Sequence, residues 1–85
     1  MPNQIDRNEI ARIVQEEISQ YVGGSFSMQD HLQAKLHLLS DDLSAIVLTL
    51  ERRFQVKIER SRYRTVFTAA DLADLFSGEL NAEGL

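Results

Sequence analysis

The sequence predicts an all-α fold, a small bundle of three main helices with one further short helix. Apolar residues recur at helical spacing in two long segments, 6–22 and 40–54, and in a shorter one, 68–77. The single proline is at position 2, so no proline interrupts these segments. No two alternating apolar segments are available to pair as strands. A chain of 85 residues has room for one domain with one small core, here placed in residues 6–78.

The first predicted helix covers residues 6–22. Asp6 followed three residues later by Glu9 is typical of a capped helix start. Gly23 and Gly24 favour an end at this point, because glycine accepts the left-handed conformation that follows many helices. One face of the helix is apolar and should face the core: Ile10, Ile13, Val14, Ile18, Tyr21 and Val22.

Residues 25–39 show no regular period and predict a long, structured loop. We expect Phe26, Met28 and Leu32 to hold this loop against the core, with one helical turn after Asp30. An apolar cluster of leucines closes the segment immediately before Ser40.

The second long helix is predicted over residues 40–54. Ser40 is a favourable N-cap, and Asp41 and Asp42 suit the positive end of the helix dipole. Five residues at helical spacing predict its core face: Leu43, Ile46, Val47, Leu50 and Phe54.

The last part of the chain predicts a basic link and a final helix. Val56 and Ile58 alternate with charged residues, but they have no partner strand, and residues 59–66 should contain one helical turn. Thr68-Ala-Ala-Asp71 is a second capping signature and starts a helix over 68–77. Gly78 is expected to end it, with 79–85 as a flexible tail.

Composition excludes several functional classes. The absence of cysteine excludes disulfides, thiolate catalysis and cysteine metal sites. No apolar signal core opens the chain, and no segment approaches the ~20 apolar residues of a membrane span, so we expect a cytoplasmic protein without membrane contact.

The formal net charge of −4 hides a basic segment, residues 52–64, which carries six bases and one acid. The remaining residues sum to −9, which argues against a nucleic-acid partner. A solvated face that docks an acidic protein is the simpler interpretation, although Tyr63 lies among the arginines.

Few residue patterns suit catalysis, and we predict that the chain is not an enzyme. No glycine-rich phosphate loop is present, and His31 and His37 lack metal-ligand spacing, so both are expected on the loop surface. Asp41 and Asp42 point ~100° apart on a helix and do not converge on one site. Ser40, at the junction of loop and helix, remains open to three interpretations: a cap, a phosphorylation site, or an attachment point for a phosphate-linked group.

The order of these features resembles the acyl carrier protein family over about residues 6–78. The clearest stretch is LHLLSDDLSAIVLTLERRFQVKI, residues 36–58. Ser40 lies fourteen residues before Phe54, as is typical of the family, and Leu50-Glu51-Arg52-Arg53-Phe54 is similar to its helix end. Further matches are Leu32, the apolar pair Val56 and Ile58, Val66-Phe67-Thr68, and Asp71 to Leu75.

The chain departs from the family pattern around the serine. Leu39 stands in place of the aspartate before it, Asp41 in place of the leucine after it, and His37 in place of a glycine. Ala45 and Arg52 stand where acidic residues are common, and the basic segment is unusual. These exchanges suggest a dedicated transferase or partner set.

The resemblance implies an acyl carrier protein with 4′-phosphopantetheine attached covalently to Ser40. The arm would hold a fatty, hydroxyacyl, aminoacyl or polyketide unit as a thioester. Partners would be a phosphopantetheinyl transferase and the acyl-loading and acyl-transfer enzymes. The partner face would comprise Leu39, Asp41, Asp42 and Glu51, on a protein expected to be a monomer. The alternative is a carrier-fold interaction module that is never modified and uses Ser40 as a cap.

Overall fold

The structure is a computed structural model that describes the backbone of residues 6–82 and the side chains of residues 6–80. It contains α1 (Arg7–Val22), α2 (Ser40–Phe54), the short 3-10 helix η1 (Arg60–Thr65) and α3 (Ala69–Ala82), with no strand in this part of the chain. The predicted all-α bundle with one short additional helix is therefore confirmed.

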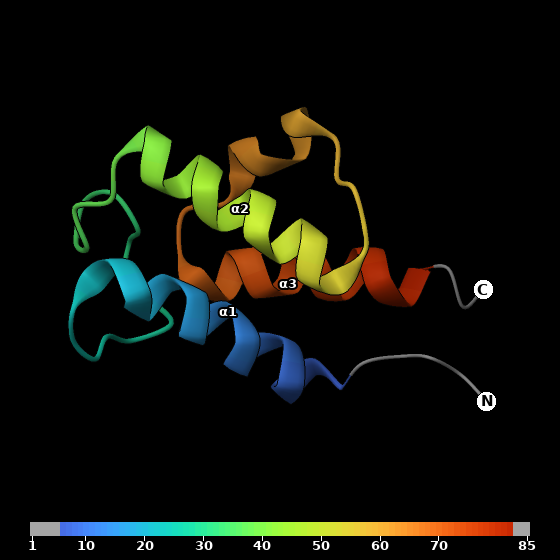
Figure 1. The fold of residues 1–85 in the computed structure, drawn as a ribbon, viewed down its shortest axis with the longest axis horizontal. Coiled ribbons are helices and arrows are strands. Elements are labelled where there is room, and N and C mark those ends of the chain that lie inside the picture. The colour runs from blue at the N-terminus through green and yellow to red at the C-terminus, as the bar shows by residue number, and fades with distance from the viewer. Residues whose placement is uncertain (1–5, 83–85) are drawn as a thin grey trace.

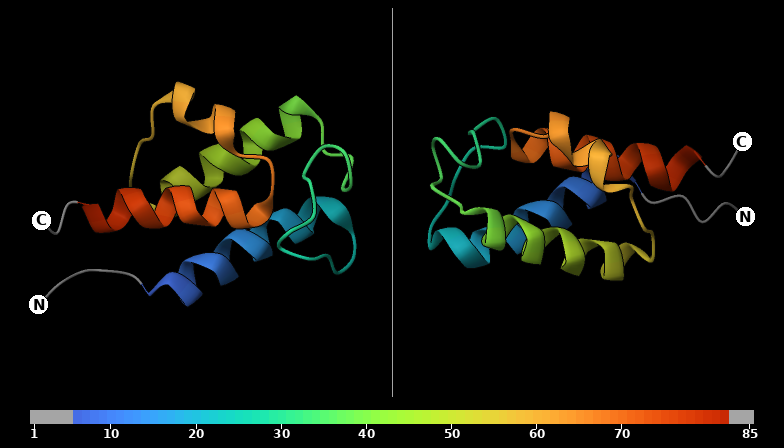
Figure 2. Two further views of the ribbon diagram at one scale, coloured as in Figure 1. Left: turned by 180° about the vertical axis from the view of Figure 1, so that it is seen from behind. Right: turned by 90° about the horizontal axis from the view of Figure 1, so that it is seen from above.

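The three long helices share one core. α1 packs most extensively against α3 and also against α2, while η1 joins α2 to α3 and packs on α3 (Figure 1). The view from above shows α2 along one edge of the bundle (Figure 2, right). Among residues 6–80, thirteen buried apolar residues form the core: Ile10, Val14, Ile18, Leu32, Leu38, Ile46, Leu50, Phe54, Ile58, Ala69, Leu72, Ala73 and Phe76.

α1 begins and ends where its capping residues predict. The Asp6 carboxylate accepts a hydrogen bond from the Asn8 N–H at 3.1 Å, and Gly23 ends the helix in the left-handed region at φ 76°. Two details of the prediction are wrong. Glu9 pairs with Arg12 instead of closing a capping box, and Tyr21 is 42% exposed because it lies at the edge of the apolar face.

The loop between α1 and α2 is attached to the start of α3. The Leu32 N–H donates to the Phe67 carbonyl at 2.8 Å, and the Ala70 N–H donates to the Met28 carbonyl at 2.9 Å. The helical turn predicted after Asp30 is present, since the Lys35 N–H donates to the His31 carbonyl at 2.9 Å. Leu32 is 2% exposed and Met28 packs against the core, so the predicted anchoring of the loop is confirmed.

α3 starts at the predicted capping box. The Thr68 hydroxyl accepts from the Asp71 N–H at 3.1 Å, and the Asp71 carboxylate accepts from the N–H groups of Phe67 and Thr68. These hydrogen bonds favour the ionised carboxylate and therefore lower the pKa of Asp71. The bond from the Phe67 N–H is the largest cause.

The predicted end of α3 at Gly78 is wrong, and so is the predicted flexible tail over residues 79–82. The helix continues through Gly78 to Ala82, and Gly78 does not adopt the positive φ of a helix stop. Glu79 accepts a hydrogen bond from Arg62 of η1, and Leu80 packs against the core. Both contacts stabilise one further turn of helix. Residues 83–85 of the predicted tail lie outside the described residues.

None of the helices in the described part combines the length and apolar character needed to cross a membrane.

Candidate functional site

Ser40 is the first residue of α2, and Leu39 rather than Ser40 is its N-cap. The Leu39 carbonyl accepts the first helical hydrogen bond, from the Leu43 N–H at 3.0 Å, and the Asp42 carboxylate accepts from the Leu39 N–H at 3.3 Å. The predicted N-cap role of Ser40 is therefore wrong. The helix spans the predicted residues 40–54, but its N-cap lies one residue earlier, where the Asp42 carboxylate accepts from the Leu39 N–H.

The Ser40 side chain is exposed and has no partner among the described residues. A capping serine would use its oxygen to accept a backbone N–H, whereas this hydroxyl stays uncommitted. It stands at the positive end of the α2 dipole, beside N–H groups of the first turn that lack helical acceptors. A phosphate ester on this oxygen would therefore carry its negative charge in a favourable place.

The residues before Ser40 hold an unusual backbone conformation. His37 adopts φ 59°, in the left-handed region that favours glycine. Next to it, Leu38 is 4% exposed, while Leu39 is 69% exposed. The reversal at His37 thus buries one leucine and leaves the other beside Ser40 on the surface.

Of the predicted partner residues, three lie together and one does not. Leu39, Asp41 and Asp42 surround Ser40 at the start of α2, and Asp41 is exposed with no partner in residues 6–82. Glu51 lies eleven residues after Ser40, or ~16 Å along the helix axis.

Glu51 is engaged within the fold. Its carboxylate accepts hydrogen bonds from the Tyr63 hydroxyl at 2.7 Å and from the Ile58 N–H at 3.3 Å. Burial of the hydroxyl raises the pKa of Tyr63 well above its usual value. The hydrogen bond to Glu51 and the negative charges of Glu51 and Glu79 raise it further. Glu51 therefore fastens η1 and the preceding link onto α2. The sequence pattern missed this role of Tyr63, since a single tyrosine among arginines carries no periodic signal.

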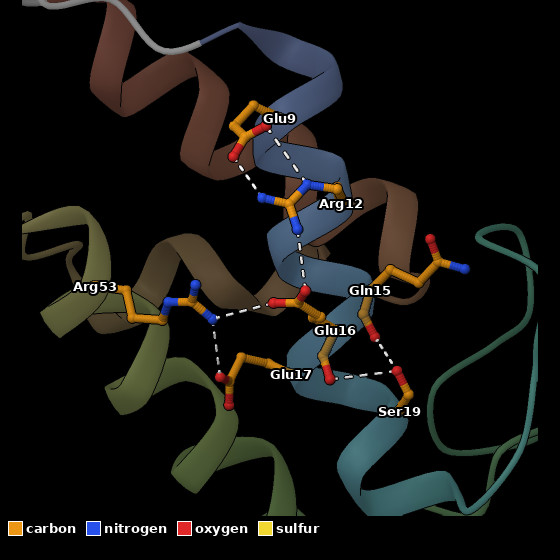
Figure 3. Close-up of polar contacts among 7 residues, drawn as sticks. All are labelled: Glu9, Arg12, Gln15, Glu16, Glu17, Ser19 and Arg53. Atoms are coloured by element: carbon orange, nitrogen blue, oxygen red, sulfur yellow. Dashed lines mark hydrogen bonds and ion pairs between the residues drawn. The ribbon is translucent and has the colours of Figure 1, made fainter.

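The basic segment divides into paired and unpaired cations. Arg53 lies 3.2 Å from Glu17 and 3.6 Å from Glu16 of α1, and Arg62 pairs with Glu79 (Figure 3 shows the Arg53 contacts). Glu16 also pairs with Arg12, so a chain of charges crosses the contact of α1 with α2. Four exposed cations of the basic segment have no partner among the described residues: Arg52, Lys57, Arg60 and Arg64.

The two histidines differ in exposure and in their contacts. His37 is exposed, as predicted, whereas His31 is half-buried and its ring centroid lies 5.8 Å from that of Phe67. The Nδ1 atom of His31 accepts from the N–H groups of Gln33 and Ala34 at 3.2 and 3.0 Å. Its expected place on the open loop surface is therefore wrong, because its ring caps the following turn.

Within the described residues, no group of three or more histidine or carboxylate side chains is arranged to hold a metal ion. Searches with the whole chain give no outside support for an identity: no protein-family model matches it, and no curated protein shows a significant match.

Proposed function

We propose that this chain is a carrier protein that holds an acyl, aminoacyl or polyketide unit on 4′-phosphopantetheine attached to Ser40. The observation that carries the proposal is the Ser40 hydroxyl itself, which is exposed and uncommitted at the first position of a long helix. The left-handed backbone at His37 adds support, since the chain adopts a glycine-like conformation where the carrier pattern has glycine.

The residues around Ser40 suit a phosphodiester. The oxygen of Ser40 is accessible to an incoming phosphate, and the first turn of α2 offers free N–H groups and a positive dipole end. When attached, the prosthetic group would supply a thiol that holds cargo as a thioester, a chemistry that this cysteine-free chain lacks. The protein would present the cargo to partner enzymes without catalysing a reaction.

The transferase and the acyl-transfer enzymes would approach the start of α2. Leu39 and Asp41 are exposed on either side of Ser40, so an enzyme that reaches the hydroxyl must contact both. They replace the acidic and apolar neighbours of the carrier pattern in reverse order, which favours a dedicated transferase. Glu51 contributes to this face only through its effect on η1.

Intact-mass measurement tests the proposal. The protein is purified from its native host, and separately incubated with coenzyme A and several phosphopantetheinyl transferases. We expect the added mass of one phosphopantetheinyl group, absent in Ser40→Ala and retained in Ser44→Ala, an exposed serine one turn further along α2. An unmodified mass from the host and with every transferase would instead favour the unmodified interaction module.

Exchange of the two flanking residues tests the transferase argument separately. If the neighbours of Ser40 limit modification by a general transferase, the double variant Leu39→Asp with Asp41→Leu should be modified faster. An unchanged rate would rule out this explanation while leaving the attachment at Ser40 intact.

A further inference from the structure

The outward face of α2 carries three exposed residues and one half-buried alanine. Asp41, Ala45, Leu48 and Arg52 fall within a stripe about 60° wide at 3.6 residues per turn. Leu48 is 54% exposed, and neither Asp41 nor Arg52 has a partner in the described chain. The view from above shows α2 at the edge of the bundle, with no other described element over its outer side (Figure 2).

The stripe is complementary to itself. When a second α2 lies antiparallel about a two-fold axis, Asp41 of each copy opposes Arg52 of the other. In the same register Ala45 of each copy opposes Leu48 of the other, so the exposed leucine meets a small apolar side chain. The acid stands at one end of the stripe and the base at the other. An antiparallel second copy matches this arrangement at both ends.

In place of the monomer that the resemblance implies, we propose that the protein self-associates as a two-fold symmetric dimer through the outward face of α2, with Asp41 paired to Arg52 of the partner at both ends. A two-fold interface uses the same patch on both copies, and this patch supplies both members of each pair. One helix face buries less than the roughly 1,200 Å² of a stable complex, so the dimer is weak and concentration-dependent. The proposal does not rest on modification of Ser40.

Sedimentation equilibrium at low salt tests the dimer, at protein concentrations up to about 1 mM, the range of weak complexes. We expect the average mass to rise toward twice the monomer mass and to fall again as salt screens the exposed charge pairs. Leu48→Asn, which leaves both charges in place, should lower the dimer fraction. A mass that stays monomeric up to this concentration overturns the proposal.

Charge reversal identifies the pairing. Asp41→Arg and Arg52→Asp should each abolish association alone, because each places like charges opposite one another at both ends. Mixed in equal amounts, they should form a heterodimer, since one copy then carries two cations and the other two anions.

Arg64→Asp is the matched control, because it makes the same charge change at an exposed, unpaired arginine outside α2. Alone it should associate like the wild type, and mixed with Asp41→Arg it should not restore the dimer. Circular dichroism establishes that each variant is folded. Failure of the two α2 variants to associate when mixed, with both folded, would refute the proposed register.

Discussion

Replacement of Arg53 by methionine should destabilise the protein by about 2 kcal/mol, through its effect on Glu17. Glu17 is 7% exposed, and its carboxylate lies 3.2 Å from the guanidinium of Arg53, whose side chain is 40% exposed. A hydrogen bond to a charged group contributes about 1.5–3 kcal/mol. Removal of one partner of a fully buried pair costs about 3–5 kcal/mol, but water that reaches the Arg53 side lowers this cost. The 3.6 Å contact with half-exposed Glu16 adds little.

Urea unfolding followed by helical circular dichroism measures the change. Glu16→Gln is the control and should cost at most about 0.5 kcal/mol, since its contacts with Arg12 and Arg53 are solvated. The double variant Glu17→Met with Arg53→Met should recover stability to within about 1 kcal/mol of the wild type, because no unpaired buried charge remains. If Arg53→Met costs no more than Glu16→Gln, the buried carboxylate does not depend on Arg53 and the reasoning fails.

Three further predictions concern backbone conformation and capping. Gly78→Ala should stabilise the protein by about 1 kcal/mol, because Gly78 lies inside α3 and an added Cβ meets nothing within 4 Å. The same change at Gly23, at φ 76°, should destabilise by about 1 kcal/mol, and an equal gain at both sites would contradict the assignment of their conformations. His37→Gly and Gln55→Gly, at φ 59° and 57°, should each raise the free energy of unfolding by about 0.5 kcal/mol; a loss at either site would show that its left-handed backbone is not strained. Because the folded state lowers the pKa of Asp71, the stability it provides is complete above its ordinary value of 3.8 and is lost as pH falls through the lowered value. Asp71→Asn should therefore weaken the loss of stability as the pH falls below about 3.8, as acid titration of unfolding would show.

Local patterns predicted the elements whose signals are local. The apolar period and the Asp6 and Gly23 caps identify α1, and the Thr68–Asp71 capping box marks the start of α3. These features depend on residues within one or two turns of each other. The same logic failed at Gly78, because a glycine ends a helix only when the chain beyond it gains nothing by continuing. Here Leu80 and the Glu79 contact with Arg62 favour continuation, and Arg62 lies seventeen residues away in sequence.

In the candidate site, too, local features could be predicted from the sequence and contacts between distant segments could not. The position of Ser40 at the start of α2 follows from the spacing of the core leucines and Phe54, and the structure agrees. The inward role of Glu51 and the charge chain through Arg53 could not be predicted, because each joins separate segments whose distance depends on the assembled bundle. The exposure of Leu48 was not predicted either, since this leucine falls between two core positions of α2.

The attachment of the first loop to the start of α3 constrains the order of folding. The N–H of Leu32 and the N–H of Ala70 each need an acceptor on the opposite segment, more than thirty positions away along the chain. During synthesis, which proceeds from the N-terminus, the loop therefore lacks these two hydrogen-bond partners until residue 70 has emerged. The surroundings of Ser40 are completed late, together with α3, and amides in the loop and in the first turn of α3 should exchange with solvent as one cooperative unit.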